Sequence, residues 1–312
     1  MRVFVAGASG VIGRPLIERL LGAGHEVTAL ARSEEKAAAL RERGVEPAIA
    51  DALDPDALRA VVIAALPEVV VNQLTALPAN LNPRKYAQEL APTSRLRREA
   101  GPVLAAAAAE AGARRVVAQS VSFMLDPSGP WVQDEDAPLY RHPPAALREA
   151  VAAMTTLEQA TLSTPGVEGV VLRYGFFYGD GQLSKDGATA QEVRRRRMPV
   201  VGSGEGRFSF IHVGDAADAT LLALDHGAPG IYNITDDEPA LQRDWVRELA
   251  TVIGAPKPWR VPLWIARLAA GQMAVGAVTL RGASNAKAKR ELGWQPAHPS
   301  WRAGFAEVFG GS

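Results

Sequence analysis

Three glycines near the start of the chain have the spacing of a phosphate-binding loop. In VFVAGASGVIGRPLIERLL, Gly7, Gly10 and Gly13 lie between an apolar run and an amphipathic stretch. Glycines at these places permit a tight turn, close approach of the backbone to a pyrophosphate, and close packing of a helix on a strand. The first turn of that helix offers free N–H groups to phosphate oxygens. We therefore predict dinucleotide binding by Gly7, Ser9, Gly10, Val11, Ile12 and Gly13.

The residues after the second apolar run indicate which dinucleotide is bound. NAD-binding folds usually carry an acid there for the ribose hydroxyls, whereas this chain has Arg32 and Ser33 in TALARSEEK. Because an arginine makes charge-assisted hydrogen bonds to a 2′-phosphate, we expect NADP rather than NAD. The less favoured alternative is that Arg32 is a solvated residue before a helix N-cap. Asp51 and Ala52, after the third run, are expected at the adenine edge, although Asp51 also suits a turn or a helix cap.

Polar residues at the ends of later strands are candidates for chemistry. In an open parallel sheet, ligands bind outside the carboxyl ends of the strands. Leu74 and Thr75 follow the fourth strand and are expected to contact the cofactor. Tyr174 follows the sixth and is our first candidate for a proton donor to a substrate oxygen, with Ser122, after the fifth, as a group that orients the substrate. Packing of Tyr174 beneath the cofactor is the open alternative.

The elements that must position these residues alternate along the chain. The expected strands are RVFVA, HEVTAL, VEPAI, EVVVNQL, RRVVAQS and VEGVVLRY, and helices are expected over 11–21, 33–43, 54–65 and 147–162. Such alternation predicts an α/β fold with a Rossmann-type doubly wound parallel sheet. We expect the dinucleotide-binding domain to span residues 1–174.

From about residue 175 the alternation becomes irregular, and glycine and proline cluster. This change predicts a smaller C-terminal substrate lobe over 175–312, with some elements returning to the sheet. Its expected elements include GRFSFIHV, a helix over 215–225, GIYNIT and a helix over 241–253.

Composition excludes several classes of function. Among 312 residues, 34 basic and 34 acidic side chains cancel, which gives no reason to expect nucleic acid or an anionic membrane as a partner. The chain has no cysteine, so disulfides and thiolate chemistry are excluded, and its five scattered histidines predict no metal site. No apolar run approaches the roughly 20 residues that span a bilayer. We expect a cytoplasmic protein, monomeric or homodimeric, that binds a small-molecule substrate.

The segments GASGVIG, RRVVAQS, VVLRYGFFYGDG, FSFIHVGDAADA and GIYNITDDEP together resemble the extended short-chain dehydrogenase/reductase superfamily, in its epimerase/dehydratase-like branch. The resemblance covers essentially the whole chain. It implies the cofactor site described above, with Ser120 at a family serine position beside the cofactor. It also implies a Ser or Thr after the fifth strand, and a Tyr and a Lys four residues apart on the next helix. In that scheme the Lys lowers the pKa of the Tyr, which passes a proton as hydride moves.

This chain differs from the family at the residues that supply the proton. Aligning the family's trailing Glu with Glu158 puts its Tyr at Ala150 and its Lys at Met154, and residues 141–158 contain no Tyr or Lys. The family's catalytic serine position is Val121, with Ser122 one residue later. The resemblance is therefore to an atypical member, in which Ala150 and Met154 are expected to face the nicotinamide half of the pocket.

A second departure concerns the substrate. Phe208 stands where sugar-nucleotide epimerases have an Arg that binds the diphosphate, and Arg207, one residue earlier on a strand, is expected to point to the opposite face. The pair Phe208 and Phe210 favours a less charged substrate. We predict an NADP-dependent oxidoreductase acting on a small, largely apolar carbonyl or hydroxyl compound. Two alternatives remain: a non-redox isomerase, dehydratase or cyclase on the same fold, or a non-catalytic protein that senses NADP.

Overall fold

The structure is a computed structural model and describes residues 1–78, 85–179, 187–271 and 273–310. At its centre lies a sheet of seven parallel strands in the order β12-β7-β5-β4-β1-β2-β3. The strands are β1 (Arg2–Ala6), β2 (Glu26–Ala31), β3 (Glu46–Ile49), β4 (Val69–Asn72), β5 (Arg115–Val121), β7 (Glu168–Tyr174) and β12 (Gly230–Ile234). The predicted doubly wound α/β fold is confirmed.

Both faces of this sheet are buried, as the near-continuous apolar strands require. In β1, Val3 and Val5 point into one core and Phe4 and Ala6 into the other, because successive side chains alternate between faces. The first core contains residues of α1 (Gly13–Gly22), α2 (Glu34–Arg41) and α8 (Val213–Leu222). The second contains residues of α3 (Pro55–Ala65) and α5 (Gly101–Glu110).

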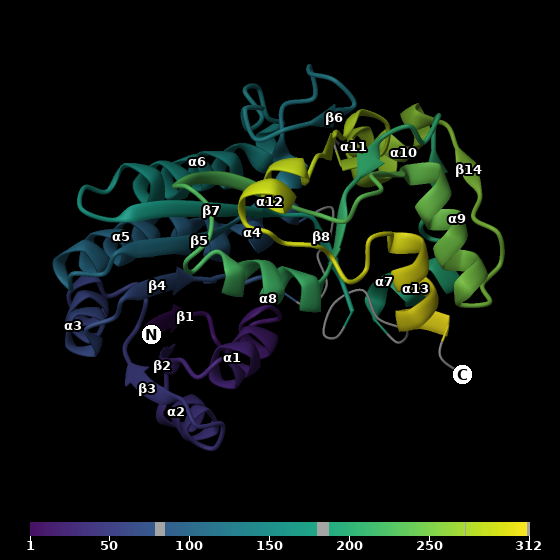
Figure 1. The fold of residues 1–312 in the computed structure, drawn as a ribbon. Coiled ribbons are helices and arrows are strands. Elements are labelled where there is room, and N and C mark those ends of the chain that lie inside the picture. The colour runs from purple at the N-terminus through teal and green to yellow at the C-terminus, as the bar shows by residue number, and fades with distance from the viewer. Residues whose placement is uncertain (79–84, 180–186, 272, 311–312) are drawn as a thin grey trace.

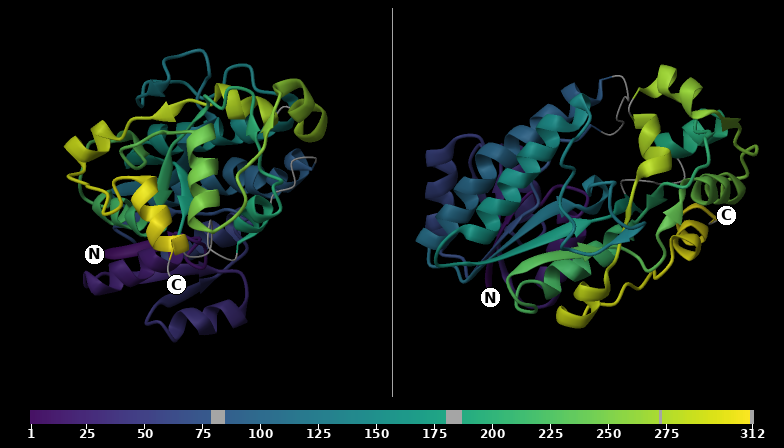
Figure 2. Two further views of the ribbon diagram at one scale, coloured as in Figure 1. Left: turned by 90° about the vertical axis from the view of Figure 1, so that its right-hand side faces the viewer. Right: turned by 90° about the horizontal axis from the view of Figure 1, so that it is seen from above.

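A group of neighbouring helices continues the second layer toward the edge where the cofactor is expected. Helix α4 (Tyr86–Arg95) passes through a π-helical turn, η1 (Leu96–Ala100), directly into α5, and α6 (Arg148–Ser163) packs against all three. Figure 2 shows these blue-to-teal helices side by side over one face of the sheet. The 16-residue helix α6 agrees closely with the helix expected over 147–162.

The seventh strand comes from the second half of the chain. GIYNIT was expected as an element of the lobe, but Gly230–Ile234 forms the edge strand β12, whose residues pair with Val170–Tyr174 of β7. Helix α8, also from the second half, packs against α1. The C-terminal half therefore does return to the sheet, whereas the domain boundary at residue 174 stays a prediction.

The rest of the second half forms a smaller body beside the sheet (Figure 1). Its core contains Tyr178, Phe210, Trp245, Trp301 and Phe305. Its strands are β8 (Phe176–Tyr178), β9 (Val200–Val201), β10 (Arg207–Phe208), β11 (Phe210–His212), β13 (Ala240–Leu241), β14 (Arg260–Val261) and β15 (Gly282–Ala283), the last paired with β6 (Val132–Gln133). Its helices are α7 (Ala188–Arg194), α9 (Gln242–Val252), α10 (Leu263–Ala270), α11 (Met273–Thr279) and α13 (Trp301–Gly310), whereas α12 (Ala286–Glu291) packs against β12 of the central sheet.

Residues 180 and 181, which end the motif VVLRYGFFYGDG, lie outside the described residues. Among the helices that are described, none combines the length and the apolar character needed to cross a membrane.

Candidate functional site

The glycine loop has the close contacts that its spacing predicts. Gly7 has a φ of +99°, and a Cβ there would lie 2.5 Å from the carbonyl oxygen of Gln73 at the end of β4. A Cβ on Gly13 would lie 2.2 Å from the Gly7 oxygen. Side chains at these positions are therefore excluded. Helix α1 begins at Gly13 without a side-chain cap, so its first-turn N–H groups face the loop that carries Ser9, Gly10, Val11 and Ile12.

Directly after β2, the exposed cation Arg32 lies where the 2′-phosphate of NADP is expected. Arg32 is exposed and makes no ion pair within the described part of the chain. The Ser33 hydroxyl caps α2 by accepting from the Lys36 N–H at 3.4 Å. No carboxylate stands at Ala31, Arg32 or Ser33. The assignment of Arg32 and Ser33 to the cofactor stays a prediction that this geometry permits.

The ends of β3 and β4 also lie at this edge of the sheet. The Asp51 carboxylate accepts from the Leu53 N–H at 2.9 Å, which makes it a turn residue that remains exposed, beside half-buried Ala52. After β4, the Asn72 side chain accepts from the Leu74 N–H at 3.1 Å and so fixes the loop that leads to Thr75. Asp51, Ala52, Leu74 and Thr75 stay candidates for cofactor contact.

Ser120 belongs to a buried ion-pair network. Its hydroxyl donates to Glu158 Oε1 at 2.6 Å, and Arg173 donates to both oxygens of the same carboxylate, at 2.9 and 2.7 Å. All three side chains are at least nine-tenths buried. The Ser120 hydroxyl therefore points toward α6, and the expectation that this side chain contacts the cofactor needs correction: its role is to tie β5 to α6.

Ser122 begins η2 (Ser122–Met124), directly after β5. Its hydroxyl donates to the backbone carbonyl of Tyr174 at 3.2 Å, and the residue is buried. The hydroxyl oxygen keeps its lone pairs and can still accept a hydrogen bond. A role for Ser122 in orienting a substrate stays a prediction.

Tyr174 is not a proton donor to substrate in this structure. The side chain is fully buried in the core between the sheet and α8. Its hydroxyl accepts from Gln73 Nε2 at 3.1 Å and lies 2.6 Å from Thr220 Oγ1, whose own proton goes to Ala216 O. The Tyr174 proton is therefore directed at Thr220, and burial raises the pKa of Tyr174 to about 12. We withdraw Tyr174 as the first candidate, because it is a packing residue.

Ala150 and Met154 lie on the face of α6 that is turned toward the end of β5. Both are buried in one apolar cluster with Val121, Leu90 and Met124. Val121 is the last residue of β5. Ala150 and Met154 are 3% and 0% exposed, so their methyl and thioether groups are packed inside this cluster. That the two positions face the nicotinamide half of the pocket stays a prediction.

Sequence reasoning missed a cation next to this cluster. Arg97 lies in the π-helical turn η1 and is only 7% exposed. Burial lowers the pKa of Arg97 to about 10, so the guanidinium is still charged at neutral pH. Its place is the one that helical spacing predicts, because Thr93 and Ala100, four residues before and three after, are also buried, whereas Arg95 and Arg98 are exposed. That spacing was the signal in the sequence.

An aromatic wall extends from Ser122 into the lobe. Phe123 stacks on Phe176 with ring centroids 4.2 Å apart, and Phe176 contacts Phe208 at 5.2 Å. These three rings come from η2, β8 and β10 and are half-buried. Arg207 points away from them and lies over the ring of Trp131, as alternation on β10 requires. The wall suits a flat, apolar ligand better than a diphosphate.

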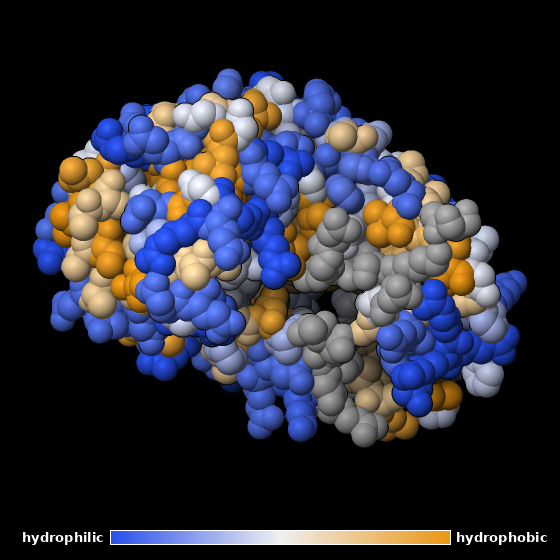
Figure 3. Space-filling view, turned by 90° about the horizontal axis from the view of Figure 1, so that it is seen from below, coloured by the Kyte–Doolittle hydropathy of each residue, from blue (hydrophilic) through white to orange (hydrophobic). Residues whose placement is uncertain are grey.

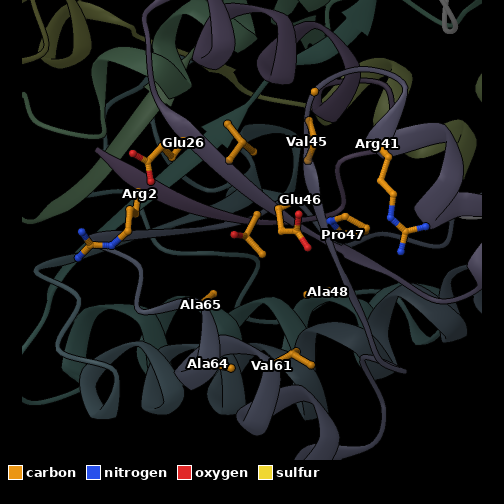
Figure 4. A pocket seen from close by; sticks show the side chains of 13 residues that line it. Arg2, Glu26, Arg41, Val45, Glu46, Pro47, Ala48, Val61, Ala64 and Ala65 are labelled. Atoms are coloured by element: carbon orange, nitrogen blue, oxygen red, sulfur yellow. The ribbon is translucent and has the colours of Figure 1, made fainter.

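Two of the hollows in the described part of the molecule bear on where the cofactor binds. A hollow of about 840 Å³ lies at the amino ends of β2 and β3, lined by Arg2, Glu26, Glu46 and Ala65 among others (Figure 4). Ligands of open α/β sheets bind at the opposite, carboxyl ends, so this hollow is not the cofactor site. Seen from below, the surface is also hollowed between the sheet and the lobe, with hydrophobic atoms at its margin (Figure 3).

One group of side chains in the described residues has the spacing of a metal site. Ligand atoms of His212, Asp215 and His298 lie within 4.8 Å of one another. The Asp215 carboxylate already accepts from the Ala297 and His298 N–H groups and from His298 Nδ1, each at 3.0 Å. His212 Nδ1 caps α8 by accepting from the Gly214 N–H. The group therefore fastens the C-terminal segment to α8.

The fold, the glycine loop and the position of α6 together define a short-chain dehydrogenase/reductase of the extended type. Residues 3–235 match the NAD-dependent epimerase/dehydratase family, and the chain belongs to that family. It is accordingly an enzyme, as the sequence predicted.

Known proteins similar to this chain include reductases. A 3-diazoavenalumate denitrifying reductase from a Streptomyces species is 45% identical over 310 residues, which are 98% of this chain and 99% of the relative. A 4-hydroxy-2-methyl-3-oxo-4-farnesyl-3,4-dihydroquinoline-1-oxide ketoreductase from Stigmatella aurantiaca is 29% identical over 275 residues, 86% of this chain and 79% of the relative. The crystal structure of human epimerase family protein SDR39U1 with NADPH has a TM-score of 0.71 at 22% identity, covering 99% of each chain, and shows the shared fold.

Proposed function

We propose that this enzyme is an NADPH-dependent reductase whose substrate is an aromatic diazonium compound. The observation that carries the proposal is that Ala150 and Met154 stand at the positions of the family's Tyr and Lys and lie in a buried apolar cluster at the end of β5. A site built in this way suits an electrophile that takes up hydride without a proton from the protein.

The chemistry of a diazonium group meets that requirement. When bound, NADPH supplies a hydride, and its electron pair forms an N–H bond at the terminal nitrogen of Ar–N₂⁺. The neutral aryl diazene Ar–N=N–H then loses N₂: the C–N bond breaks and the hydrogen ends on carbon. One NADPH is oxidised, one N₂ leaves, and no net proton is needed. A carbonyl, in contrast, needs a proton for the developing alkoxide.

The chain's own residues would bind the cofactor, orient the substrate and shield it from water. The loop from Gly7 to Gly13 and the first turn of α1 hold the pyrophosphate, and Arg32 holds the 2′-phosphate. Phe123, Phe176 and Phe208 offer a flat wall for an arene and exclude water from a reactive cation. The denitrifying reductase at 45% identity, whose name contains a diazo substrate, supports this assignment.

The experiment measures NADPH consumption and N₂ release together. Purified enzyme is incubated with NADPH and a ¹⁵N-labelled hydroxyaryl diazonium salt. We expect one labelled N₂ for each NADPH oxidised, at a rate well above that of an enzyme-free control, since NADPH alone reduces some diazonium ions. Absence of N₂ release above that control would overturn the proposal.

A second candidate is reduction of a small, largely apolar ketone, which the sequence predicts. The aromatic wall and the ketoreductase from Stigmatella aurantiaca favour it. The same assay with aryl ketones in place of the diazonium salt separates the two candidates. NADPH oxidation with ketones and none with the diazonium compound would favour this second candidate.

A further inference from the structure

A smaller hollow lies beside β10, on the face of that strand opposite the aromatic wall. Its volume is about 170 Å³, and it is lined by Trp131, Glu205, Arg207, Leu241 and Arg243, which we call the lobe pocket. Arg207 and Phe208 are successive residues of β10, so their side chains point to opposite faces. Phe208 contacts Phe176 in the aromatic wall, whereas Arg207 lines the lobe pocket. The lobe pocket is therefore separate from the wall that we assign to the substrate.

Segments far apart in the sequence meet at the lobe pocket. Trp131 directly precedes β6, and its carbonyl accepts from the Gly282 N–H at 3.0 Å, where β6 pairs with β15. In Figure 1, β6 lies next to α11 of the lobe. Arg207 pairs with Leu241 across β10 and β13, and Arg243 lies in the first turn of α9. The lining residues are thus held in place by strand pairing and by a helix.

Arg207 is a cation that no protein acceptor holds. Its guanidinium makes no hydrogen bond or ion pair with the residues that the structure describes, and its buried Nε has no partner there. Its guanidinium carbon lies 5.8 Å from the centroid of the Trp131 ring, within the range of a cation–π contact. The terminal N–H donors of Arg207 are therefore left for an acceptor that a ligand brings into the pocket.

Arg243 adds a second cation that is loosely held. It donates to the Ser203 carbonyl at 3.3 Å, and the carboxylates of Glu205 and Asp244 lie 3.9 Å away, beyond hydrogen-bond distance. Glu205 is the one acid among the lining residues, and its side chain is 54% exposed. Two guanidinium groups and one carboxylate leave the lobe pocket with an excess of positive charge, which favours an anion.

The remaining lining residues are apolar and flat. Trp131 is 40% exposed, although a tryptophan is usually well buried. Arg281 lies 4.1 Å from its ring centroid and is itself bonded to the carbonyls of Gly129 and Thr279, which supports the ring. The volume of the pocket is below the roughly 300–1,000 Å³ of sites for drug-sized ligands. It suits a ligand of about one ring with one charged group.

We propose that the lobe pocket is a second binding site, which takes a small organic monocarboxylate with a flat, apolar body. Arg207 and Arg243 would hold the carboxylate through charge-assisted hydrogen bonds. The body of the ligand would lie against Trp131 and Leu241. This site goes beyond the proposed function, because its ligand is neither the cofactor nor the compound that is reduced, and no reaction is assigned to it.

Benzoate is the probe that tests this site. It is titrated by calorimetry into the NADP⁺-bound enzyme beside benzamide, which has the same shape without the charge, and inorganic phosphate, which has charge without a ring. We expect benzoate to bind at least about tenfold more tightly than either, as a charge-assisted hydrogen bond predicts. Arg207→Met should weaken benzoate binding about tenfold or more, and Trp131→Leu a few-fold.

Two further variants distinguish binding at the lobe pocket from damage to the fold. Glu205→Gln removes a like charge and should strengthen benzoate binding a few-fold, which a misfolded protein would not do. Arg247→Met removes an exposed arginine of α9 that does not line the pocket, and should bind benzoate as the wild type does. If Arg207→Met fails to fold, judged by NADP⁺ binding, Glu205→Gln and Trp131→Leu decide.

The outcomes that would overturn the proposal are distinct from those of the N₂ assay. Equal affinities for benzoate and benzamide, or for benzoate and phosphate, would contradict the class of ligand. Because benzoate is flat, Phe123→Leu tests binding at the aromatic wall. A loss of benzoate affinity in Phe123→Leu and none in Arg207→Met would place the probe at the wall and overturn the lobe pocket as its site.

Discussion

At the scale of single residues, Arg32 determines the expected cofactor preference. It is exposed, makes no ion pair within the described residues, and stands where NAD-binding folds carry an acid. A charge-assisted hydrogen bond contributes about 1.5–3 kcal/mol. We therefore predict that Arg32→Ala weakens NADPH binding at least about tenfold and leaves NADH binding unchanged, as measured by calorimetry.

Arg41 provides the matched control for this substitution. It lies on α2, where it pairs with Glu34 on the surface. Arg41→Ala should alter the affinity for neither cofactor. Equal affinities for NADPH and NADH in the wild type would contradict the assignment of Arg32.

For Tyr174 we predict an effect on stability and little effect on catalysis. Because its hydroxyl is enclosed between Gln73 and Thr220, Tyr174→Phe should leave kcat within about threefold of wild type. The loss should appear in stability, since Gln73 and Thr220 each lose a buried partner, at a cost of about 1–3 kcal/mol. Denaturant unfolding and steady-state kinetics on the same preparation check both parts. A large fall in kcat at unchanged stability would restore Tyr174 as an acid.

The residues that the sequence placed well are those whose roles depend on local spacing. Gly7 and Gly13 are fixed by the turn and by the approach of α1 to β1, which three-residue spacing already specifies. The role of Tyr174 was predicted wrongly, because its position at the end of a strand does not indicate on which face of the sheet its side chain lies. It lies on the α8 face, whereas Arg173 lies on the α6 face. Arg97 lies at regular helical spacing from buried Thr93 and Ala100, but its charge is typical of a solvent-exposed residue, so residue type and spacing give opposite predictions there.

At the scale of elements, a buried ion pair holds α6 against the sheet. Glu158 on α6 accepts from Arg173 on β7 and from Ser120 on β5, and both charged side chains are less than one-tenth exposed. Removing one partner of such a pair leaves an uncompensated charge, at a cost of about 3 kcal/mol or more. We predict that Glu158→Gln lowers the free energy of unfolding by about that amount, measured by denaturant titration.

The surface pair of Arg59 and Glu110, which joins α3 to α5, gives the comparison. Exposed pairs contribute about 0–1 kcal/mol, so Glu110→Gln should change stability little. Equal losses of stability from the two substitutions would show that the Glu158 network does not hold α6 against the sheet.

The elements themselves were largely predictable, for a physical reason. Each strand of the first half is an apolar run followed by a helix with its own start signal, such as Ser33 capping α2 or Asp54 capping α3. The pairing of β12 with β7 is different, because it joins residues about 60 positions apart and depends on the shape of the sheet edge. Local pattern identified GIYNIT as a strand and could not say to which sheet it belonged.

At the scale of the whole molecule, the sheet and the lobe are joined through a buried acid. Asp236 follows β12, is 1% exposed, and its N–H donates to Phe210 O at 2.7 Å. Its Oδ1 accepts from the Glu238 N–H at 3.2 Å, whereas its buried Oδ2 has no hydrogen-bond partner in the described residues. Glu238 and Asp237 lie nearby, and their charges add to the effect of burial. The backbone of Asp236 therefore links the end of the edge strand β12 to β11, and its carboxyl group is buried where the sheet meets the lobe.

This acid predicts a pH dependence of stability. Burial raises the pKa of Asp236 to about 8, well above that of an unfolded aspartate. Between the two values the folded state retains a proton that the unfolded state has lost. The contribution to stability is therefore full at acidic pH and is lost as pH rises toward 8.

Asp236→Asn cannot ionise, so the variant should not show this loss. Measured by denaturant unfolding, the stability of the wild type relative to the variant should fall by more than about 1 kcal/mol between pH 5 and pH 8. The neighbouring Asp237→Asn, which removes an exposed partner of Lys289, should keep most of the wild-type fall, because burial is the largest cause of the raised pKa of Asp236 and the charge of Asp237 is the smallest of those given. Parallel curves for wild type and Asp236→Asn would show that Asp236 is ionised in the folded protein, and that its buried oxygens are stabilised by groups other than a bound proton.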